Sequence, residues 1–455
     1  MTSERVTTWE AIQQLLEEGD AEVLGAFVDS LPVSELLRAL SRLAPSEREL
    51  LLRELPAETA ANLIEEIPDL QAAELIDLLP ADEAAAIVSE LPSDEQADIL
   101  ANLDAEEAES ILEFLDPEEA DRARQLISYD AESAGGLMMK EFVALSPSAR
   151  AREVIDAVMG HGNEYALYNV QYTYVVTPRR RRLLGVVRFR DVVGGAADAT
   201  LRSIMMPAES VAVGTALLEL HDIFEATELP ALPVVDAAGA MVGVLRREAV
   251  SHALSERATV EHLKSQGIIG GEESRSMPVS KRAGRRLAWL TLNIGLNVVA
   301  ASVIASFEET LSAVIALAVF LPIVSDMSGC SGNQAVAVSM RELSLGVVKP
   351  IDALRVWRLE ASVGIINGLV LGTMLGVGAW AWKGNVYLGL VVAAALATNT
   401  LVAVSIGGTV PLVLRRMGFD PAVASGPILT TVTDMCGFFL VLGLATLTLP
   451  LLRGY

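Results

Sequence analysis

The last third of the sequence contains five long apolar stretches, and they constrain the fold more than any other feature. The first, Leu287–Phe307, has 21 residues and no charged side chain. About 20 apolar residues are enough for a helix to cross the hydrocarbon core of a bilayer. Asp326 and Asp434 are the only charged residues in the other four stretches. These are Leu311–Met340, Ala361–Trp382, Gly384–Leu414 and Pro421–Leu452. We therefore expect residues 285–455 to form a transmembrane domain of five helical spans.

Basic residues flank these stretches on alternate sides. KRAGRR precedes the first stretch, four Lys or Arg residues lie between the second and third, and Arg415 and Arg416 lie between the fourth and fifth. Loops rich in Lys and Arg stay in the cytoplasm. The sequence thus predicts a multi-pass protein of the cytoplasmic (inner) membrane, in contact with lipid. Its N-terminus is expected in the cytoplasm and its C-terminus outside. The acidic N-terminal segment, which has no apolar signal-peptide region, also indicates a cytoplasmic N-terminus.

Residues 30–128 repeat with a period near 12, as in LPADEAAAIVSE and LPSDEQADILAN. Each unit has a proline or aspartate in the same phase, followed by acidic residues and then apolar ones. These positions are Pro32, Pro45, Pro56, Pro68, Pro80, Pro92, Asp104 and Asp116. Proline and acids suit the first turn of a helix. Each unit is therefore predicted to be one short helix, and the units to stack into an all-α superhelix over residues 1–130.

The negative charge of the chain is concentrated in this segment. Residues 1–130 hold 33 acidic residues against 7 arginines, a net charge of −26. Such a surface repels nucleic acid and attracts cations, so we expect no nucleic-acid partner. Most of these carboxylates are expected to lie on solvated helix faces.

The middle of the chain contains a repeated strand, turn, strand and helix pattern. NVQYTYVVTPRRRRLLGVVRFRDVV and ALPVVDAAGAMVGVLRREAV carry it, each preceded by a helical stretch and a Met-Met pair. This α+β repeat resembles a tandem pair of CBS domains, at residues 131–198 and 199–258. Such modules bind nucleotides or metal ions and regulate an attached domain. Arg188 and Arg246 stand where a nucleotide-contacting hydroxyl is usual, so nucleotide binding stays an open question.

Asp434 lies inside the last apolar stretch, where a charge costs roughly 2.5–3.5 kcal/mol on insertion scales. No Lys, Arg or His lies within the five stretches to pair with it. The carboxyl group is then either neutral and a hydrogen-bond donor, or it lines a water-filled path and contacts a cation. Nearby oxygen donors favour the cation, because hard divalent ions prefer oxygen ligands. They are the hydroxyls of Thr430, Thr431 and Thr433 and the carbonyls freed near Gly426 and Pro427.

The second stretch contains PIVSDMSGCSGNQ, residues 322–334. Pro322, Gly329 and Gly332 are expected to break a helix there, which membranes tolerate where the backbone lines a cavity. A glycine-rich packing face would also explain the glycines. It would not explain the polar Asp326 and Asn333, which we predict to be metal ligands with Asp434.

These features together resemble the MgtE family of magnesium channels over essentially the whole chain. The specific motifs are FEE after the first span, P-x-x-x-D-x-x-G-x-x-G-x-Q at 322–334 and DPA-x-x-SGP-x-x-TT-x-x-D at 420–434. The resemblance implies a homodimer that transports Mg²⁺, with Asp434 of both subunits in the pore. It also implies that Mg²⁺ bound by the soluble domains holds the pore shut. A connecting region at 259–284, with a helix near Val279–Ala288, would transmit closure.

Three residues are candidate regulatory metal ligands. Asp94 and Asp98 share one helix face at i, i+4 spacing, although an ordinary solvated helix face explains them slightly better. Glu261 lies in the connecting region beside His262, where relatives have a second acid.

The sequence also departs from the family in the second apolar stretch, where Cys330 replaces an asparagine that is common in the family.

Other functions leave weaker signatures. The sequence lacks the H-E-x-x-H motif of an intramembrane metalloprotease, and its four histidines all precede the apolar stretches, so no enzyme is predicted. A membrane anchor would not need Asp434 or Asp326. Transport of Co²⁺, Mn²⁺ or Ca²⁺, cation-coupled secondary transport, and a carrier instead of a channel stay open.

Overall fold

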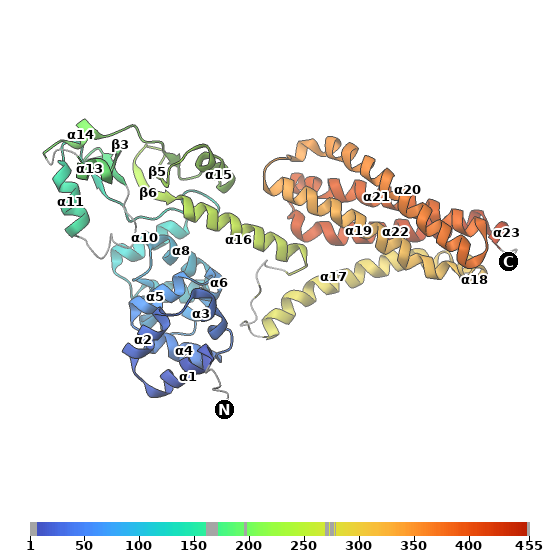
Figure 1. The fold of residues 1–455 in the computed structure, drawn as a ribbon, viewed down its shortest axis with the longest axis horizontal. Helices are drawn as coiled ribbons and strands as arrows, with labels where there is room; N and C mark the ends of the chain where they lie inside the picture. The colour runs from blue at the N-terminus through green and yellow to red at the C-terminus, as the bar shows by residue number, and fades with distance from the viewer. Residues whose placement is uncertain are drawn as a thin grey trace, which may run out of the picture. The chain divides into compact units, whose positions relative to one another are not determined.

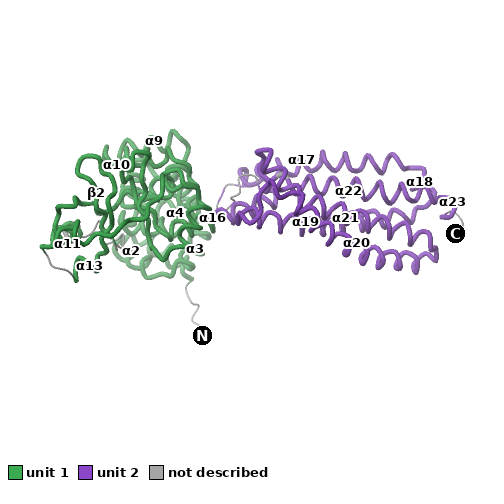
Figure 2. Tube along the Cα trace, turned by 90° about the horizontal axis from the view of Figure 1, so that it is seen from above, with its two compact units in different colours: residues 1–255, 274–276 green, residues 256–273, 277–455 purple. Residues whose placement is uncertain are grey.

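The structure is a computed structural model that describes residues 7–160, 172–194, 198–268, 273, 277 and 279–452. Two compact units make up the chain, residues 1–255 with 274–276 and residues 256–273 with 277–455 (Figure 2). Helix α16 (Arg247–Ser265) begins in the first unit and ends in the second. The predicted order of a helical, a mixed and a second helical region is confirmed.

Residues 8–127 fold into ten short helices, α1 to α10 (Figure 1). Their bounds are Thr8–Glu18, Ala21–Asp29, Val33–Leu40, Pro45–Glu54, Ala57–Glu65, Asp69–Ile76, Ala81–Val88, Ser93–Asn102, Ala105–Leu112 and Pro117–Ile127. Helices two apart in the chain pack together, α5 on α7, α6 on α8, α7 on α9 and α8 on α10. Their apolar side chains share one core. The predicted helical N-terminal domain is confirmed.

Most prolines of the repeat lie one position earlier than the pattern predicted. Five of the six are N-cap residues, and Pro45 alone is the first residue of its helix. At Pro56 the backbone is extended, with φ −54° and ψ 142°, and its carbonyl accepts the N–H of Ala60 at 2.9 Å. Proline suits an N-cap because its φ is fixed near about −65° and no helical hydrogen bond needs its N–H.

Two three-stranded sheets follow, and they have the same topology. β1 (Ala144–Leu145) pairs in parallel with β2 (Tyr172–Val176), which pairs antiparallel with β3 (Leu183–Arg188). β4 (Val211–Ala212), β5 (Ala231–Val235) and β6 (Met241–Arg246) repeat this order. Both middle strands shift register between their last two residues. The matching irregularity confirms the predicted repeat. The helices of this region are α11 (Ala151–Gly160), α13 (Phe189–Gly194), α14 (Leu201–Ile204) and α15 (Leu217–Ala226).

The segments that carry the Met-Met pairs are exchanged between the two repeats. Met139 forms a backbone bridge with Val244 of the second sheet, while Met206 forms one with Val186 of the first. Each repeat therefore completes the other, and backbone hydrogen bonds cross the sequence boundary predicted at 198/199.

The second unit is helical within its described residues. After the end of α16 come α17 (Val279–Ala305), α18 (Glu308–Ala313), α19 (Leu317–Ser344), η1 (Pro350–Asp352), α20 (Ala353–Lys383), α21 (Val386–Met417), α22 (Pro421–Leu447) and α23 (Leu449–Leu452). The helix expected near Val279–Ala288 is the first part of α17.

Four helices among the described residues are long and apolar enough to cross a membrane: α17, α20 with η1, α21 and α22. The predicted count of five is not confirmed. The stretch expected at Leu311–Met340 is divided between α18 and α19, and α19 is less apolar because it carries several serines, Asp326 and Asn333.

Helices α20 and α21 pack closely through small residues. Four glycines recur every fourth residue on the buried face of α20, from Gly364 to Gly376. A Cβ on Gly372 would lie 2.6 Å from the carbonyl oxygen of Ala393 on α21, too close for any side chain. Small residues at this spacing let membrane helices approach until their backbones touch.

The expected break in the second apolar stretch is wrong. Helix α19 runs without interruption through Pro322, Gly329 and Gly332. Gly332 is a packing residue, because its carbonyl oxygen would lie 2.3 Å from a Cβ on Gly407 of α21. Neighbouring helices hold the helical backbone here, which outweighs the local preference of glycine and proline for a break.

Candidate functional site

Asp434 lies in the middle of α22, and its side chain is half-buried. Its Oδ1 accepts a hydrogen bond from the hydroxyl of Ser325 on α19. Asp326, the next residue of α19, is close enough for its charge to interact with that of Asp434. Among the described residues no basic group is found bonded to Asp434.

The three threonines before Asp434 use their hydroxyl protons within α22. Thr430 donates to the carbonyl of Gly426 at 3.0 Å, Thr431 to that of Pro427 at 2.7 Å, and Thr433 to that of Thr430 at 2.9 Å. The helix continues through Pro427, so the carbonyls of Gly426 and Pro427 are occupied rather than freed as predicted. Because a donating hydroxyl keeps its lone pairs, the exposed Thr430 still offers an oxygen to water or a cation.

A stripe along α19 is exposed, whereas the serines of this helix at 325, 328, 331 and 339 are buried. Pro322, Asp326, Cys330 and Asn333 are all exposed, at spacings of four, four and three residues. Gly332 faces inward, and Gly329 lies where α19 passes α22, with a Cβ position 3.8 Å from the Thr433 hydroxyl. The structure therefore brings Ser325 into contact with Asp434, and Asp326 follows Ser325 in the chain. Asn333 shares the exposed stripe with Asp326 but has no recorded contact with Asp434.

Sequence reasoning missed two polar residues at this site. Ser325 is 8% exposed and contacts Asp434 directly. Asn399 of α21 is fully buried, and its Nδ2 donates to the carbonyl of Thr433 at 3.0 Å. Asparagine inside an apolar stretch is a detectable signal because it is costly in lipid. One serine among many on α19 is not.

The candidate regulatory residue Asp94 is buried in the first unit, with 4% of its surface exposed. Its Oδ2 pairs with Nη2 of Arg246 at the end of β6, at 3.0 Å. Its Oδ1 and Nε of Arg246 are buried without a hydrogen-bond partner in the described part of the chain. An ordinary wet helix face is therefore the wrong interpretation for Asp94. Arg246 contacts a carboxylate here.

Asp94 belongs to an acidic cluster that we define as Glu65, Asp69, Asp94, Glu95 and Asp98. Burial raises the pKa of Glu95 to about 8, and the charges of the other four carboxylates add to this. Burial likewise raises the pKa of Asp69, with the nearby His252 acting in the opposite direction. The carboxylates of the cluster thus repel one another in the folded state. A divalent cation or protons would relieve this repulsion.

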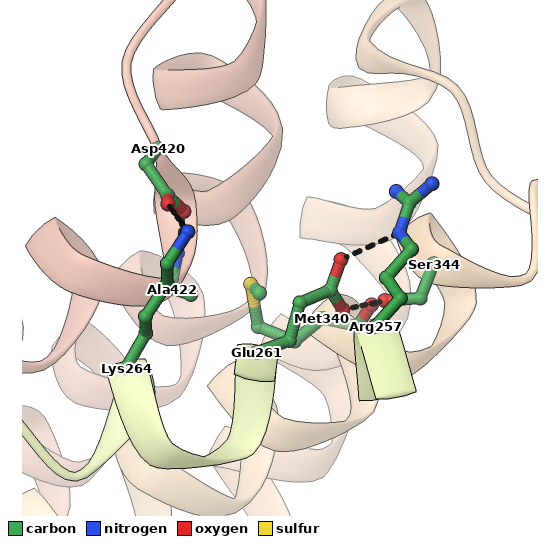
Figure 3. A network of polar contacts seen from close by, with 7 residues as sticks. All are labelled: Arg257, Glu261, Lys264, Met340, Ser344, Asp420 and Ala422. Carbon is green, nitrogen blue, oxygen red and sulfur yellow. Dashed lines mark hydrogen bonds and ion pairs between the residues drawn. The ribbon is translucent and has the colours of Figure 1, made fainter. Parts of the chain in front are cut away.

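Glu261 lies near the end of α16 in the second unit and links it to α19 (Figure 3). Its Oε1 accepts a hydrogen bond from Nε of Arg257 at 3.1 Å, and its Oε2 accepts one from the hydroxyl of Ser344 at 2.5 Å. One turn further on, Lys264 forms a salt bridge of 3.1 Å with Asp420, the N-cap residue of α22. The end of α16 is therefore attached both to α22, which contains Asp434, and to α19, which contains its partner Ser325. The sequence did not predict these partners.

No group of three or more acidic, histidine or cysteine side chains in the described ranges is arranged to hold one metal ion. The acidic cluster does not form such a group. Asp434 and its neighbours contribute few protein ligands, an arrangement that suits an ion that keeps most of its water.

Three family models match this chain in the predicted order. The MgtE intracellular N domain matches residues 31–132, a CBS domain matches 201–256, and the MgtE divalent cation transporter matches 321–444. The last match covers most of α19, α20, α21 and the Asp434 region of α22.

Known relatives resemble most of the chain. The magnesium transporter MgtE of Thermus thermophilus is 31% identical over 71% of this chain and 72% of its own length. The magnesium transporter MgtE of Bacillus subtilis is 28% identical over 70% of each. A crystal structure of the soluble part of a magnesium transporter, 21% identical, covers 55% of this chain and 98% of its own with a TM-score of 0.50, which concerns the fold alone. From its ordered domains and its identity with these relatives, we conclude that the chain belongs to the MgtE family of divalent cation transporters.

Proposed function

We propose that this protein conducts Mg²⁺ across the cytoplasmic membrane along a path lined by α19 and α22, and that Mg²⁺ bound to its cytosolic domains regulates the flux. The observation that carries the proposal is the carboxylate of Asp434, which lies in an apolar helix without a basic partner among the described residues. The magnesium transporters that resemble the chain support the choice of ion. We assign no enzymatic activity.

The ligands at the site suit a hydrated ion. Mg²⁺ loses its water reluctantly and is usually held by one or two carboxylates while it keeps several waters. Asp434 and the exposed Thr430 hydroxyl offer oxygen to such an ion without enclosing it. Weak binding of this kind lets an ion enter and leave. Co²⁺ and Mn²⁺ are alternative substrates that the oxygen ligands do not exclude.

We propose that α19 is the fifth membrane span. Its 28 residues correspond to about 42 Å at 1.5 Å per residue, which exceeds the bilayer core. Two of its buried serines donate to neighbouring helices, Ser325 to Asp434 and Ser339 to the carbonyl of Gly408 at 2.8 Å. Five spans put the N-terminus in the cytoplasm and the C-terminus outside, with the transmembrane pore domain at 285–455.

A homodimer would cover the polar stripe on α19. Asp326 and Asn333 are exposed on a bundle whose other surfaces are largely apolar. Charged and amide side chains are costly against lipid and normally face a bundle interior or a water-filled cavity. A second copy facing this stripe would enclose water between the two chains and bring both Asp434 side chains to one path.

Regulation is assigned to two places in the chain. The acidic cluster of the first unit would take up Mg²⁺, because burial and mutual repulsion of its carboxylates favour a divalent counter-ion. This requires residues 1–130 and the two CBS domains at 131–198 and 199–258. Glu261, at the end of α16 within the connecting region 259–284, lies where ion binding would alter the attachment to α19 and α22. Differential ion binding then shifts the population of open and closed states.

The test is Mg²⁺ uptake into proteoliposomes containing the full chain, for the wild type, Asp434→Asn and Asp434→Ala. Both variants are expected to abolish uptake and to remain folded dimers, because they remove the charge but little volume. Ser302→Ala on α17, whose hydroxyl donates to its own helix, is the matched control and should transport normally. Unchanged uptake in both Asp434 variants would refute the path.

A further inference from the structure

Ser325 changes what Asp434 can offer to an ion. The Ser325 hydroxyl donates to Oδ1 of Asp434 from a position that is 8% exposed, so one lone pair of this oxygen is already used within the helix bundle. The other oxygen, Oδ2, accepts no hydrogen bond from the described residues. The carboxylate therefore presents Oδ2 fully to a passing ion, and Oδ1 with one acceptor site fewer.

The backbone beneath Asp434 is held by a second residue. Asn399 of α21 is fully buried and donates Nδ2 to the carbonyl of Thr433, the residue before Asp434. Gly437, one turn later, packs directly on the same amide, with a Cβ position 2.8 Å from Nδ2. Helix α22 is thus fixed against α21 on one side of Asp434, while Ser325 of α19 fixes the carboxylate on the other. Both the helix turn and the carboxylate are therefore held by contacts to neighbouring helices.

The number of available oxygens distinguishes divalent cations. Ca²⁺ takes six to eight oxygen ligands and often binds a carboxylate through both oxygens, whereas Mg²⁺ requires octahedral geometry and keeps its waters. A carboxylate that is held in one orientation, with one oxygen already hydrogen-bonded, can still accept hydrogen bonds from the waters of Mg²⁺. It is a poorer bidentate ligand for Ca²⁺.

We propose that Ser325 is a positioning residue that sets ion selectivity, because its hydrogen bond fixes the orientation of the Asp434 carboxylate and uses one acceptor site of Oδ1, which disfavours bidentate binding of Ca²⁺ relative to the binding of hydrated Mg²⁺. The proposal rests on the proposed function, since it assumes that the ion passes Asp434.

The experiment measures Mg²⁺ uptake into proteoliposomes containing the full chain while external Ca²⁺ is increased. In Ser325→Ala the half-inhibitory Ca²⁺ concentration is expected to fall about fivefold, the effect of one hydrogen bond of about 1 kcal/mol. Ser325→Thr keeps the hydroxyl and should restore the wild-type value. Ser325→Val has the shape of the threonine variant without the hydroxyl, and it should behave like Ser325→Ala; this pair decides the matter if Ser325→Ala does not fold.

Ser328→Ala is the matched control. Ser328 lies on the same helix and is fully buried, but its hydroxyl donates to the carbonyl of Val324. It should leave Ca²⁺ inhibition unchanged. An unchanged half-inhibitory concentration in Ser325→Ala and Ser325→Val would overturn the inference, as would an equal change in Ser328→Ala. Failure of the proposed function is seen separately, as Mg²⁺ uptake that survives in Asp434→Asn.

Discussion

Replacing Arg246 by methionine tests the electrostatics of the first unit most directly. Arg246 and Asp94 form a salt bridge of 3.0 Å in which the side chains are 28% and 6% exposed. Removing one partner of a buried pair usually costs about 3–5 kcal/mol, because the remaining charge is left without compensation. Methionine retains much of the packing of the arginine stem. Since Arg246 is partly exposed, we expect the lower end of this range, about 3 kcal/mol.

The assay is calorimetry of the full chain in detergent, following the transition of the first unit. For a unit of this size, 1 kcal/mol corresponds to about 2–4 °C, so the transition should fall by about 6–12 °C. Adding Asp94→Asn to Arg246→Met should recover most of the loss, because it removes the uncompensated charge. Mg²⁺ should stabilise Arg246→Met more than the wild type, since a cation can then occupy the place of the guanidinium.

Arg188→Met supplies the control, because Arg188 holds the equivalent position in the first repeat. Its salt bridge is to Asp191, three residues away, and both side chains are about one-third exposed, at 34% and 33%. Such a local exposed pair contributes less than about 1 kcal/mol. The reasoning is refuted if Arg246→Met lowers the transition no more than Arg188→Met does.

Three further predictions concern other parts of the chain. Glu95 has a folded-state pKa of about 8 against an ordinary value of 4.5, so the folded state holds an extra proton between these pH values. The free energy of unfolding should therefore fall as the pH rises from about 5 to 8. Calorimetry across this range should show a smaller change with pH for Glu95→Gln than for the wild type. Lys264→Ala removes an exposed salt bridge to Asp420 and should cost less than about 1 kcal/mol of stability. It should nevertheless raise Mg²⁺ uptake at high internal Mg²⁺, because it loosens α16 from α22. Uptake equal to that of the wild type would contradict the proposed attachment. Gly372→Val should lower the melting temperature in detergent, because its Cβ would lie 2.6 Å from a backbone oxygen of α21. We expect a cost of about 1–3 kcal/mol. Gly378→Val on the same helix should not lower it, because no neighbouring atom lies within 4 Å of the Cβ position of Gly378.

Much of the architecture was predictable because it depends on local chemistry. The N-terminal helices start where proline or aspartate recurs. Aspartate can accept a hydrogen bond from a free N–H group at the start of a helix, and proline has no N–H group to satisfy, so both effects depend on residues close together in the sequence. The two mixed repeats were recognisable because each strand pair is joined by a short turn. The apolar stretches followed from the length needed to cross a bilayer. Asp434 was identifiable because one charge in such a stretch is costly.

Local preference misled where packing decides the conformation. Pro322, Gly329 and Gly332 predicted a broken helix, but α19 is continuous because Gly332 packs against Gly407 of another helix. The carbonyls of Gly426 and Pro427 were expected to be free, but they accept the hydroxyl protons of Thr430 and Thr431.

The sequence by itself determined the order of domains, the helical repeat and the position of one carboxylate in a membrane helix, since each depends on residues close together in the chain. Only the tertiary structure decided which groups meet. Ser325 reaches Asp434 across 109 residues, Arg246 reaches Asp94 across 152, and Lys264 reaches Asp420 across 156. Such pairs form because helix packing and strand pairing bring their backbones together, and no pattern in either segment alone specifies the partner.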